Sequence, residues 1–164
     1  MLFITRLGLN TRLPYHGFIY AVAFGGSVFY SFIVSPLVFK RLPRQEFSDL
    51  QAVVFPTYFA GQIIAPLLLA ATTSVSPCPV HYGALALSAL GGIINYFWLL
   101  PKCADIKVRR NQAKEGTEEY NELSKQFGKY HGLSTLANIV SIVSLGFYGL
   151  LWQKSLTSTM VIHP

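Results

Sequence analysis

Apolar residues in this chain are gathered into four long segments, and the charged residues lie almost entirely between them. The segments run approximately over 13–39, 50–73, 83–100 and 132–152. A helix rises about 1.5 Å per residue, so about 20 residues cross the ~30 Å hydrocarbon core of a bilayer. Inside that core every backbone polar group needs a partner within the protein, which a helix provides. The pattern predicts an all-α membrane protein with four transmembrane helices, forming a single integral membrane domain over residues 1–164.

The largest polar piece of the chain, 102–129, predicts an amphipathic helix between the third and fourth spans. Thr117 is a suitable N-cap for it, and two glutamates follow in its first turn. Apolar side chains then recur at helical spacing at Tyr120, Leu123 and Phe127. We expect this helix to lie on the membrane or on its own bundle, leading into the fourth span. A docking surface for another protein is the alternative.

Charged residues are scarce, at 12% of the chain against a usual ~25%, while 52% of residues are hydrophobic. No Asp, Glu, Lys or Arg occurs anywhere from 50 to 101. A soluble fold would need more polar surface than this composition supplies. The absence of ionisable acids and bases inside the spans also argues against ion-coupled transport, which usually needs such a group in the membrane.

The distribution of basic residues predicts how the chain is oriented. Ten of the 13 Lys and Arg residues lie in the two loops after the first and third spans. By the positive-inside rule these loops face the cytosol or an equivalent compartment, with both termini on the far side. Lys40, Arg41 and Arg44 are then placed to contact lipid headgroups or a partner. The net charge of +6 therefore needs no nucleic acid to explain it.

The first residues of the chain bear on its location. Residues 1–12 contain two arginines and no acid, which also suits a mitochondrial presequence. We expect an uncleaved juxtamembrane segment instead. The predicted location is an endomembrane, such as the endoplasmic reticulum, or a mitochondrial membrane.

A few polar residues fall inside the predicted spans. Tyr58, Asn95 and Asn138 lie at similar depths in three different spans, and His131 lies close to the same end. These residues predict an intramembrane polar layer. The layer is either an interhelical hydrogen-bonded clasp or a site for a substrate or ion.

Small residues recur every four positions in the first and third spans and predict close helix packing. The stripes comprise Ala23, Ser27, Ser31 and Ser35 in the first span and Ala84, Ser88 and Gly92 in the third. They are expected to meet other helices of the bundle or a second copy of the chain. Pro56 and Pro66 are expected to bend the second span.

No constellation for catalysis is visible in the sequence. The histidines His16, His81, His131 and His163 are scattered over helix ends and loops, which disfavours haem binding. Cys78 and Cys103 fall at opposite faces of the membrane and cannot pair within one chain. We therefore predict no enzymatic activity, no cofactor and no metal site.

Several motifs resemble the transmembrane protein 205-like family. They are Lys40-Arg41-Leu42-Pro43-Arg44 with Phe47, Gln51 and Phe55-Pro56-Thr57-Tyr58-Phe59, then Asn95 to Pro101, and Phe127-Gly128-Lys129-Tyr130-His131-Gly132-Leu133-Ser134 with Asn138. Their order and spacing agree with the family over approximately 24–143. The resemblance implies a small four-helix protein of endomembranes or organelles, without established catalytic activity or cofactor. Where that family tends to have Arg and Glu, this chain has Phe97 and Leu100, so a charged pair is absent.

Two functions remain open at this stage. The leading hypothesis is a structural protein, adaptor or complex subunit, which contacts a membrane-protein partner through 102–129 or forms a homo-oligomer in the bilayer. The alternative is a carrier for lipids or small molecules, with a polar cavity near Tyr58, Asn95 and Asn138.

Overall fold

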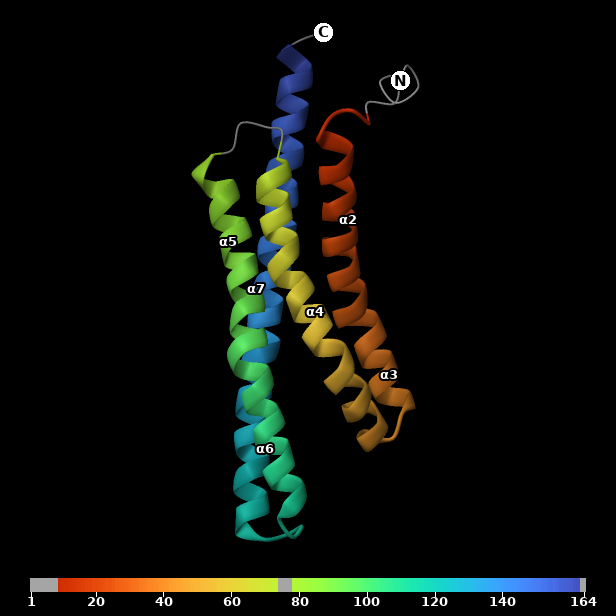
Figure 1. The fold of residues 1–164 in the computed structure, drawn as a ribbon, viewed down its shortest axis with the longest axis vertical. Helices are drawn as coiled ribbons and strands as arrows, with labels where there is room; N and C mark the ends of the chain where they lie inside the picture. The colour runs from red at the N-terminus through yellow and green to blue at the C-terminus, as the bar shows by residue number, and fades with distance from the viewer. Residues whose placement is uncertain (1–8, 74–77, 163–164) are drawn as a thin grey trace.

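The computed structural model describes residues 9–73 and 78–162, with side chains described as far as 158. Four long helical rods lie side by side and alternate in direction (Figure 1). The first rod comprises α2 (Leu13–Phe29), the π-helical turn η1 (Tyr30–Val34) and α3 (Ser35–Arg41). The second is α4 (Arg44–Thr72). The third comprises α5 (Pro79–Ile94), the π-helical turn η2 (Asn95–Leu99) and α6 (Leu100–Gln112), and the fourth is α7 (Glu118–Ile162).

All four rods are long and apolar enough to cross a membrane, which confirms the predicted count of spans. The qualifying helices are Leu13–Arg41, Arg44–Thr72, Pro79–Gln112 and Glu118–Ser158. The break between the second and third rods coincides with Pro77 and Pro79 in the sequence, and proline interrupts a continuous helix. Residues 74–77 of that break lie outside the described residues, as do 1–8 of the possible presequence and His163.

Each π-helical turn ends directly before a proline-containing pair, Ser35-Pro36 or Leu100-Pro101. The amide of Ser35 donates to the carbonyl of Tyr30, and the amide of Leu100 donates to that of Asn95, which are the bonds to position i−5 that define a π turn. Pro36 and Pro101 follow at once. A proline ring collides with the carbonyl four residues earlier in a regular helix. The wider turn relieves that collision, so both rods continue beyond their prolines.

The continuation of the third rod changes the expected ending of span three. The sequence placed the end near residue 100, whereas α6 carries the helix on to Gln112. The predicted amphipathic helix begins at Glu118, where Thr117 accepts a hydrogen bond from the amide of Tyr120. It is not a separate element, because no proline follows until the end of the chain and α7 runs unbroken into the fourth span.

The apolar stripe on the first turns of α7 packs against α6. Leu123 and Ile106 are fully buried in this helical hairpin. The guanidinium of Arg110 lies 5.1 Å from the ring centroid of Phe127. The stripe thus contacts the chain's own bundle, as one of the two interpretations expected.

Small residues allow close approach at the centre of the bundle. An added Cβ on Gly91 would lie 2.6 Å from the carbonyl oxygen of Ala137, and one on Gly92 would lie 3.1 Å from the backbone of Gln62. Because neither Gly91 nor Gly92 has a side chain, α5 packs closely against α7 at Gly91 and against α4 at Gly92. In the third-span stripe, Ala84, Ser88 and Gly92 are all buried. In the first-span stripe only Ser27 is buried, while Ala23, Ser31 and Ser35 are half-buried.

α2 is the rod with the least support from the bundle. It contacts α4 and α7, and only 6% of the apolar window of its rod is buried, the remaining side chains being half-buried or exposed. α4 runs beside α5 in its upper half and slants towards α3 in its lower half (Figure 1), as expected for a helix with two internal prolines.

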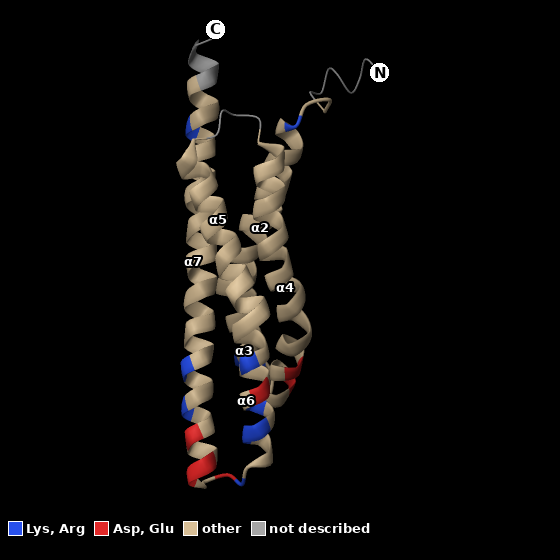
Figure 2. Cartoon of the chain, turned by 60° about the vertical axis from the view of Figure 1, so that its left-hand side comes forward, with Lys and Arg blue, Asp and Glu red and all other residues tan. Residues whose placement is uncertain are grey.

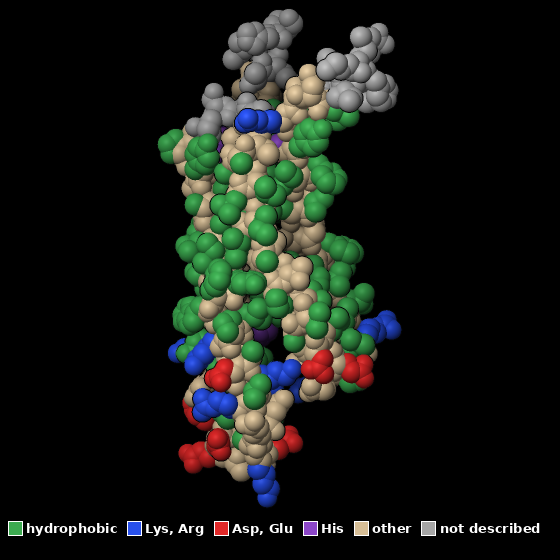
Figure 3. All heavy atoms as spheres, in the orientation of Figure 1, with side chains coloured by type: hydrophobic (Ala, Val, Ile, Leu, Met, Phe, Trp, Pro, Cys, Tyr) green, Lys and Arg blue, Asp and Glu red, His purple; other side chains and the backbone are tan. Residues whose placement is uncertain are grey.

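Charged residues gather at one end of the molecule (Figure 2). Among the described residues only Arg12 and Lys154 lie at the other end, where α2 begins and α7 ends. Between the two ends the surface is dominated by hydrophobic side chains (Figure 3). Both charged turns thus lie at the same end of the apolar surface, and the side of a membrane that this end faces stays a prediction.

Candidate functional site

Polar side chains from three rods meet near the middle of the bundle in a central cluster, defined as Ser31, Tyr58, Gln62 and Asn138. Asn138 Oδ1 accepts hydrogen bonds from Tyr58 Oη at 3.0 Å and from Gln62 Nε2 at 2.7 Å. Asn138 Nδ2 donates to Ser31 Oγ at 3.1 Å, and Ser31 Oγ lies 2.8 Å from Tyr58 Oη. Since Tyr58 donates its proton to Asn138, Ser31 donates to Tyr58. The cluster is a closed ring that joins the first, second and fourth rods.

A second glutamine of α4 makes a similar bond one layer below. Tyr30 Oη donates to Gln51 Oε1 at 2.5 Å, and Gln51 Nε2 lies 3.4 Å from Ser35 Oγ. Both the acceptor and the donor of this amide are therefore occupied. The pair fastens the lower part of the first rod to α4.

Asn95 lies apart from the central cluster, although the sequence predicted one layer. Its Nδ2 donates to the carbonyl oxygen of Ser134 at 3.2 Å, and its Oδ1 accepts from Ser134 Oγ at 2.6 Å. Ser134 precedes Asn138 by one helical turn on α7, so Asn95 binds the same helix one turn closer to the charged end. His131 is further along still and stacks on Phe127, with ring centroids 5.6 Å apart.

The central cluster borders a groove between α2 and α4 with a volume of about 790 Å³. Exposed apolar side chains of the two helices form its rim, including Phe18, Val22 and Ile64. Buried residues of α5 and α7, namely Ser88, Ser141, Ile142 and Leu145, form its floor. The volume lies within the ~300–1,000 Å³ typical of small-molecule sites.

The groove is lined by no Asp, Glu, Lys, Arg or His among the described residues, and most of its buried polar side chains are occupied by internal hydrogen bonds. Ser141 Oγ donates to the carbonyl oxygen of Ser88 at 2.8 Å. Tyr58 is engaged in the central cluster. Among the buried side-chain nitrogen and oxygen atoms of the lining, Gln62 Oε1 is the exception: the residue is only 6% exposed, and this oxygen has no hydrogen-bond partner among the described residues.

A third polar site, at the end of the bundle that carries few charges, was missed by the sequence analysis. His16 is fully buried between Thr72 and Tyr148, with its Nδ1 2.9 Å from Thr72 Oγ1 and its Nε2 2.9 Å from Tyr148 Oη. Thr72 Oγ1 donates to the carbonyl oxygen of Leu68. Thr72 therefore accepts from Nδ1–H of His16, and in the uncharged ring Nε2 then accepts from Tyr148. His16 is a clasp between three rods.

His81 lies near this clasp without joining it. Its Nδ1 is 3.0 Å from Cys78 Sγ and its Nε2 is 3.4 Å from Ser155 Oγ. Its ring lies edge-on to Tyr148, with centroids 6.0 Å apart. Among the described residues, no group of three or more His, Cys, Asp or Glu side chains could hold a metal ion.

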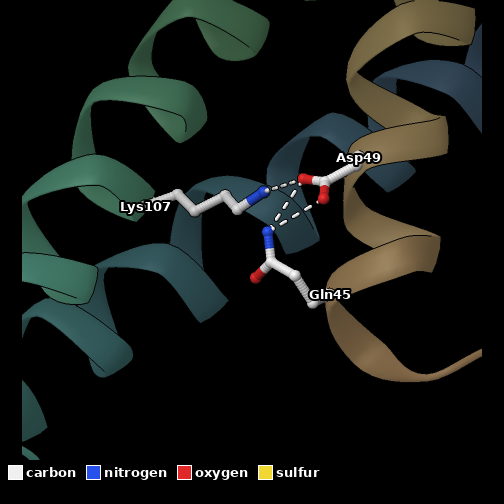
Figure 4. A network of polar contacts seen from close by, with 3 residues as sticks. All are labelled: Gln45, Asp49 and Lys107. Carbon is white, nitrogen blue, oxygen red and sulfur yellow. Dashed lines mark hydrogen bonds and ion pairs between the residues drawn. The ribbon is translucent and has the colours of Figure 1, made fainter.

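The basic residues Lys40, Arg41 and Arg44 lie at the turn between α3 and α4, at the charged end of the bundle. Close to that turn Asp49 Oδ1 lies 3.6 Å from Lys107 Nζ on α6. Gln45 Nε2 donates to both oxygens of the same carboxylate, at 2.9 and 3.0 Å (Figure 4). The side chains are solvent-accessible, so the pair contributes little to stability. It does link the two charged segments directly.

Comparison with known proteins places most of the groove inside a family match. Residues 18–112 match the family described as "Domain of unknown function (DUF4149)". A protein of Aspergillus fumigatus described as "Xanthocillin biosynthesis cluster protein D" is 29% identical over 154 residues, which is 90% of this chain and 93% of that protein. No solved structure matches the chain. The matched range includes both walls of the groove and Ser88 on its floor.

Proposed function

The chain belongs to the DUF4149 family, and from its four apolar rods and the groove between α2 and α4 we propose that it binds the apolar chain of a lipid or small molecule within the bilayer. The groove is the observation that carries this proposal. Its rim consists of exposed apolar side chains on two membrane-spanning helices, so a hydrophobic ligand reaches it sideways from the lipid phase. Chemistry on the ligand is not part of the proposal, since binding alone accounts for the site.

The apolar lining suits the hydrocarbon chain of a ligand rather than a compact polar solute. Apolar surface contributes about 25 cal/mol per Å² when it is removed from water, but within a bilayer this gain is absent. Selective binding must then come from shape and from the few polar groups. The groove offers both, because buried serines and two members of the central cluster, Tyr58 and Gln62, line an otherwise hydrophobic groove.

Two adjacent glycines on α2 provide a test with a matched control. Gly26 lines the groove and Gly25 does not, and an added Cβ would have no neighbour within 4 Å at either position. Gly26→Leu is expected to fill the groove, whereas Gly25→Leu adds the same side chain to the lipid-facing surface. Both changes raise helix propensity equally.

The measurement uses a hexadecanol photoprobe with a diazirine in its chain, added to the purified protein in phosphatidylcholine nanodiscs. Saturable crosslinking to α2 and α4 is expected for the wild type and for Gly25→Leu, with at least a fivefold loss for Gly26→Leu. Unsaturable labelling that is equal in all three proteins would show that bulk lipid, and not a site, is being sampled. That outcome would end the proposal.

An adaptor role is the second candidate and rests on a different feature. The hairpin of α6 and α7 carries charged residues beyond the turn of α3 and α4 (Figures 1 and 2). Its apolar stripe is occupied within the chain, so a partner would have to recognise the charged exterior. Crosslinking in native membranes followed by mild extraction tests this role, and recovery of the bare monomer under several gentle detergents would count against it.

Membrane location and orientation belong to the same proposal. We infer that the charged end faces the cytosol, or the equivalent compartment of an organelle, because ten of the 13 basic residues lie in its two loops. The motif resemblance to transmembrane protein 205-like proteins supports placement in an endomembrane or organelle.

A further inference from the structure

We propose that the groove selects an uncharged amphipathic ligand whose head group donates a hydrogen bond to Gln62 Oε1. This inference rests on the proposed function and specifies the ligand of the same site. Long-chain alcohols, and lipids that end in a hydroxyl or an amide N–H, have the required chemistry.

The state of the Gln62 amide gives the first part of the argument. Its Nε2 donates to Asn138 Oδ1 and to Tyr58 Oη, so its orientation is fixed by two partners. The other end of the amide, Oε1, is buried and has no partner among the described residues. An unpaired buried acceptor is costly, and native structures normally satisfy such groups. Gln62 lines the groove while neighbouring atoms cover Oε1, so a ligand head group that inserts beside the Gln62 side chain can supply the missing donor.

The remaining polar lining sharpens the choice. Ser141 donates to Ser88, and Tyr58 donates to Asn138. These hydroxyl groups therefore already donate to other protein atoms, and the partner that Gln62 Oε1 lacks is a hydrogen-bond donor. A head group that can only accept, such as an ether or ester oxygen, would leave Oε1 unpaired.

The lack of ionisable lining excludes charged head groups from the proposal. A phosphate or ammonium at this depth would have no counter-charge among the residues that line the groove. Burying an isolated charge in such surroundings is strongly unfavourable. The ligand is thus a neutral molecule with one apolar chain or ring system and at least one donor.

Competition against the photoprobe tests this selectivity on the wild-type protein in nanodiscs. The unlabelled competitors are hexadecanol, hexadecyl methyl ether and hexadecyl phosphate, which share one chain and differ in the head group. Hexadecanol is expected to compete about tenfold more strongly than the ether, equivalent to ~1.4 kcal/mol. Hexadecyl phosphate is expected to compete no better than the ether.

Two glutamine variants localise the effect. Gln62→Met removes the vacant acceptor and is expected to reduce the preference for alcohol over ether to less than about twofold. Gln51→Met is the control, since Gln51 is equally buried in α4 but is fully paired and does not line the groove. It should keep the tenfold preference. The wild-type ranking decides the matter on its own if Gln62→Met does not fold.

The outcomes separate the two proposals. Equal competition by alcohol and ether, with binding still lost in Gly26→Leu, would overturn the role of Gln62 and leave the groove as a chain-binding site. No effect of Gly26→Leu on any ligand would overturn the groove itself. A crosslink between the α2 helices of two copies, with no saturable probe binding, would show that a second copy fills the groove and would overturn both.

Discussion

The hydroxyl of Tyr148 has a specific task in the clasp around His16. It supplies the proton that His16 Nε2 accepts, because the other ring nitrogen donates to Thr72. Both residues are almost fully buried, so no water replaces the phenol if it is removed. The bond joins α2 to α7, whose residues form part of the floor of the groove.

Tyr148→Phe is therefore expected to lower the free energy of unfolding by about 1 kcal/mol, in the range measured for buried and intramembrane hydrogen bonds. Thermal unfolding in detergent, followed by circular dichroism, measures the change. Tyr96→Phe is the control, because the Tyr96 hydroxyl makes no hydrogen bond within the described part of the chain. Equal shifts in the two variants would contradict the assigned proton arrangement.

Individual site residues were only partly predictable from the sequence. Tyr58 and Asn138 stand out as polar residues in apolar spans, and the structure brings them together. Gln62 follows Tyr58 by four positions and so shares its helix face, a signal that the sequence contained. The sequence could not show that Asn95 lies outside the central cluster, because its predicted depth is similar to that of Tyr58 and Asn138. Only the rotation of its helix about its own axis directs Asn95 to Ser134 instead.

At the scale of the helices, Gly91 sets the distance between α5 and α7. A methyl group there would collide with the carbonyl oxygen of Ala137 and with Ser141 Cβ, at 2.6 and 2.9 Å. The atoms that would have to move belong largely to a helix backbone. The two rods would need to separate.

Gly91→Ala is accordingly expected to destabilise the protein by about 1–3 kcal/mol, the usual cost of overpacking. Gly83→Ala on the same helix is the matched control, since nothing lies within 4 Å of its added methyl. There the gain in helix propensity should leave stability unchanged or raise it by up to ~1 kcal/mol. Melting temperatures of the two variants, compared side by side, check the prediction. A stable Gly91→Ala would show that the rods are less tightly packed than described.

The positions of the helices were predicted well from the distribution of charged residues and prolines. The residues at which the helices end were predicted less well. The four spans and the start of α7 follow directly from the apolar runs and the Thr117 cap. The extension of the third rod did not, because Pro101 normally ends or bends a helix. A π-helical turn before the proline preserves the rod, and nothing in Asn95 to Leu99 marks that turn in the sequence.

For the molecule as a whole, the two cysteines report the topology. Cys78 precedes α5, and Cys103 lies in α6 at the other end of the same rod. Both are free. A membrane-impermeant maleimide applied to sealed vesicles should label Cys78 and Cys103 from opposite sides. Labelling after detergent treatment provides the total for each thiol, and reaction of both from one side would contradict the four-span arrangement.

The groove is the feature of the whole molecule that the sequence did not predict. The alternative hypothesis placed a cavity near Tyr58, Asn95 and Asn138, and of these three residues only Tyr58 lines the groove. Its volume depends on how α2 rests against the slanting α4, and on small residues that leave space between them. Such angles arise from packing between rods and have no local signature in the chain.

The fastening of α2 has a mechanical consequence. His16 ties the helix to Thr72 and Tyr148 near one end, and Ser31 ties it to Tyr58 and Asn138 near the other. The 15 residue steps between them span about 22 Å. The groove-lining residues of α2 all lie between these two anchor points or directly beside them. In engineering terms the helix is a beam clamped at both ends, so any widening of the groove with both joints closed requires α2 to bend at mid-span.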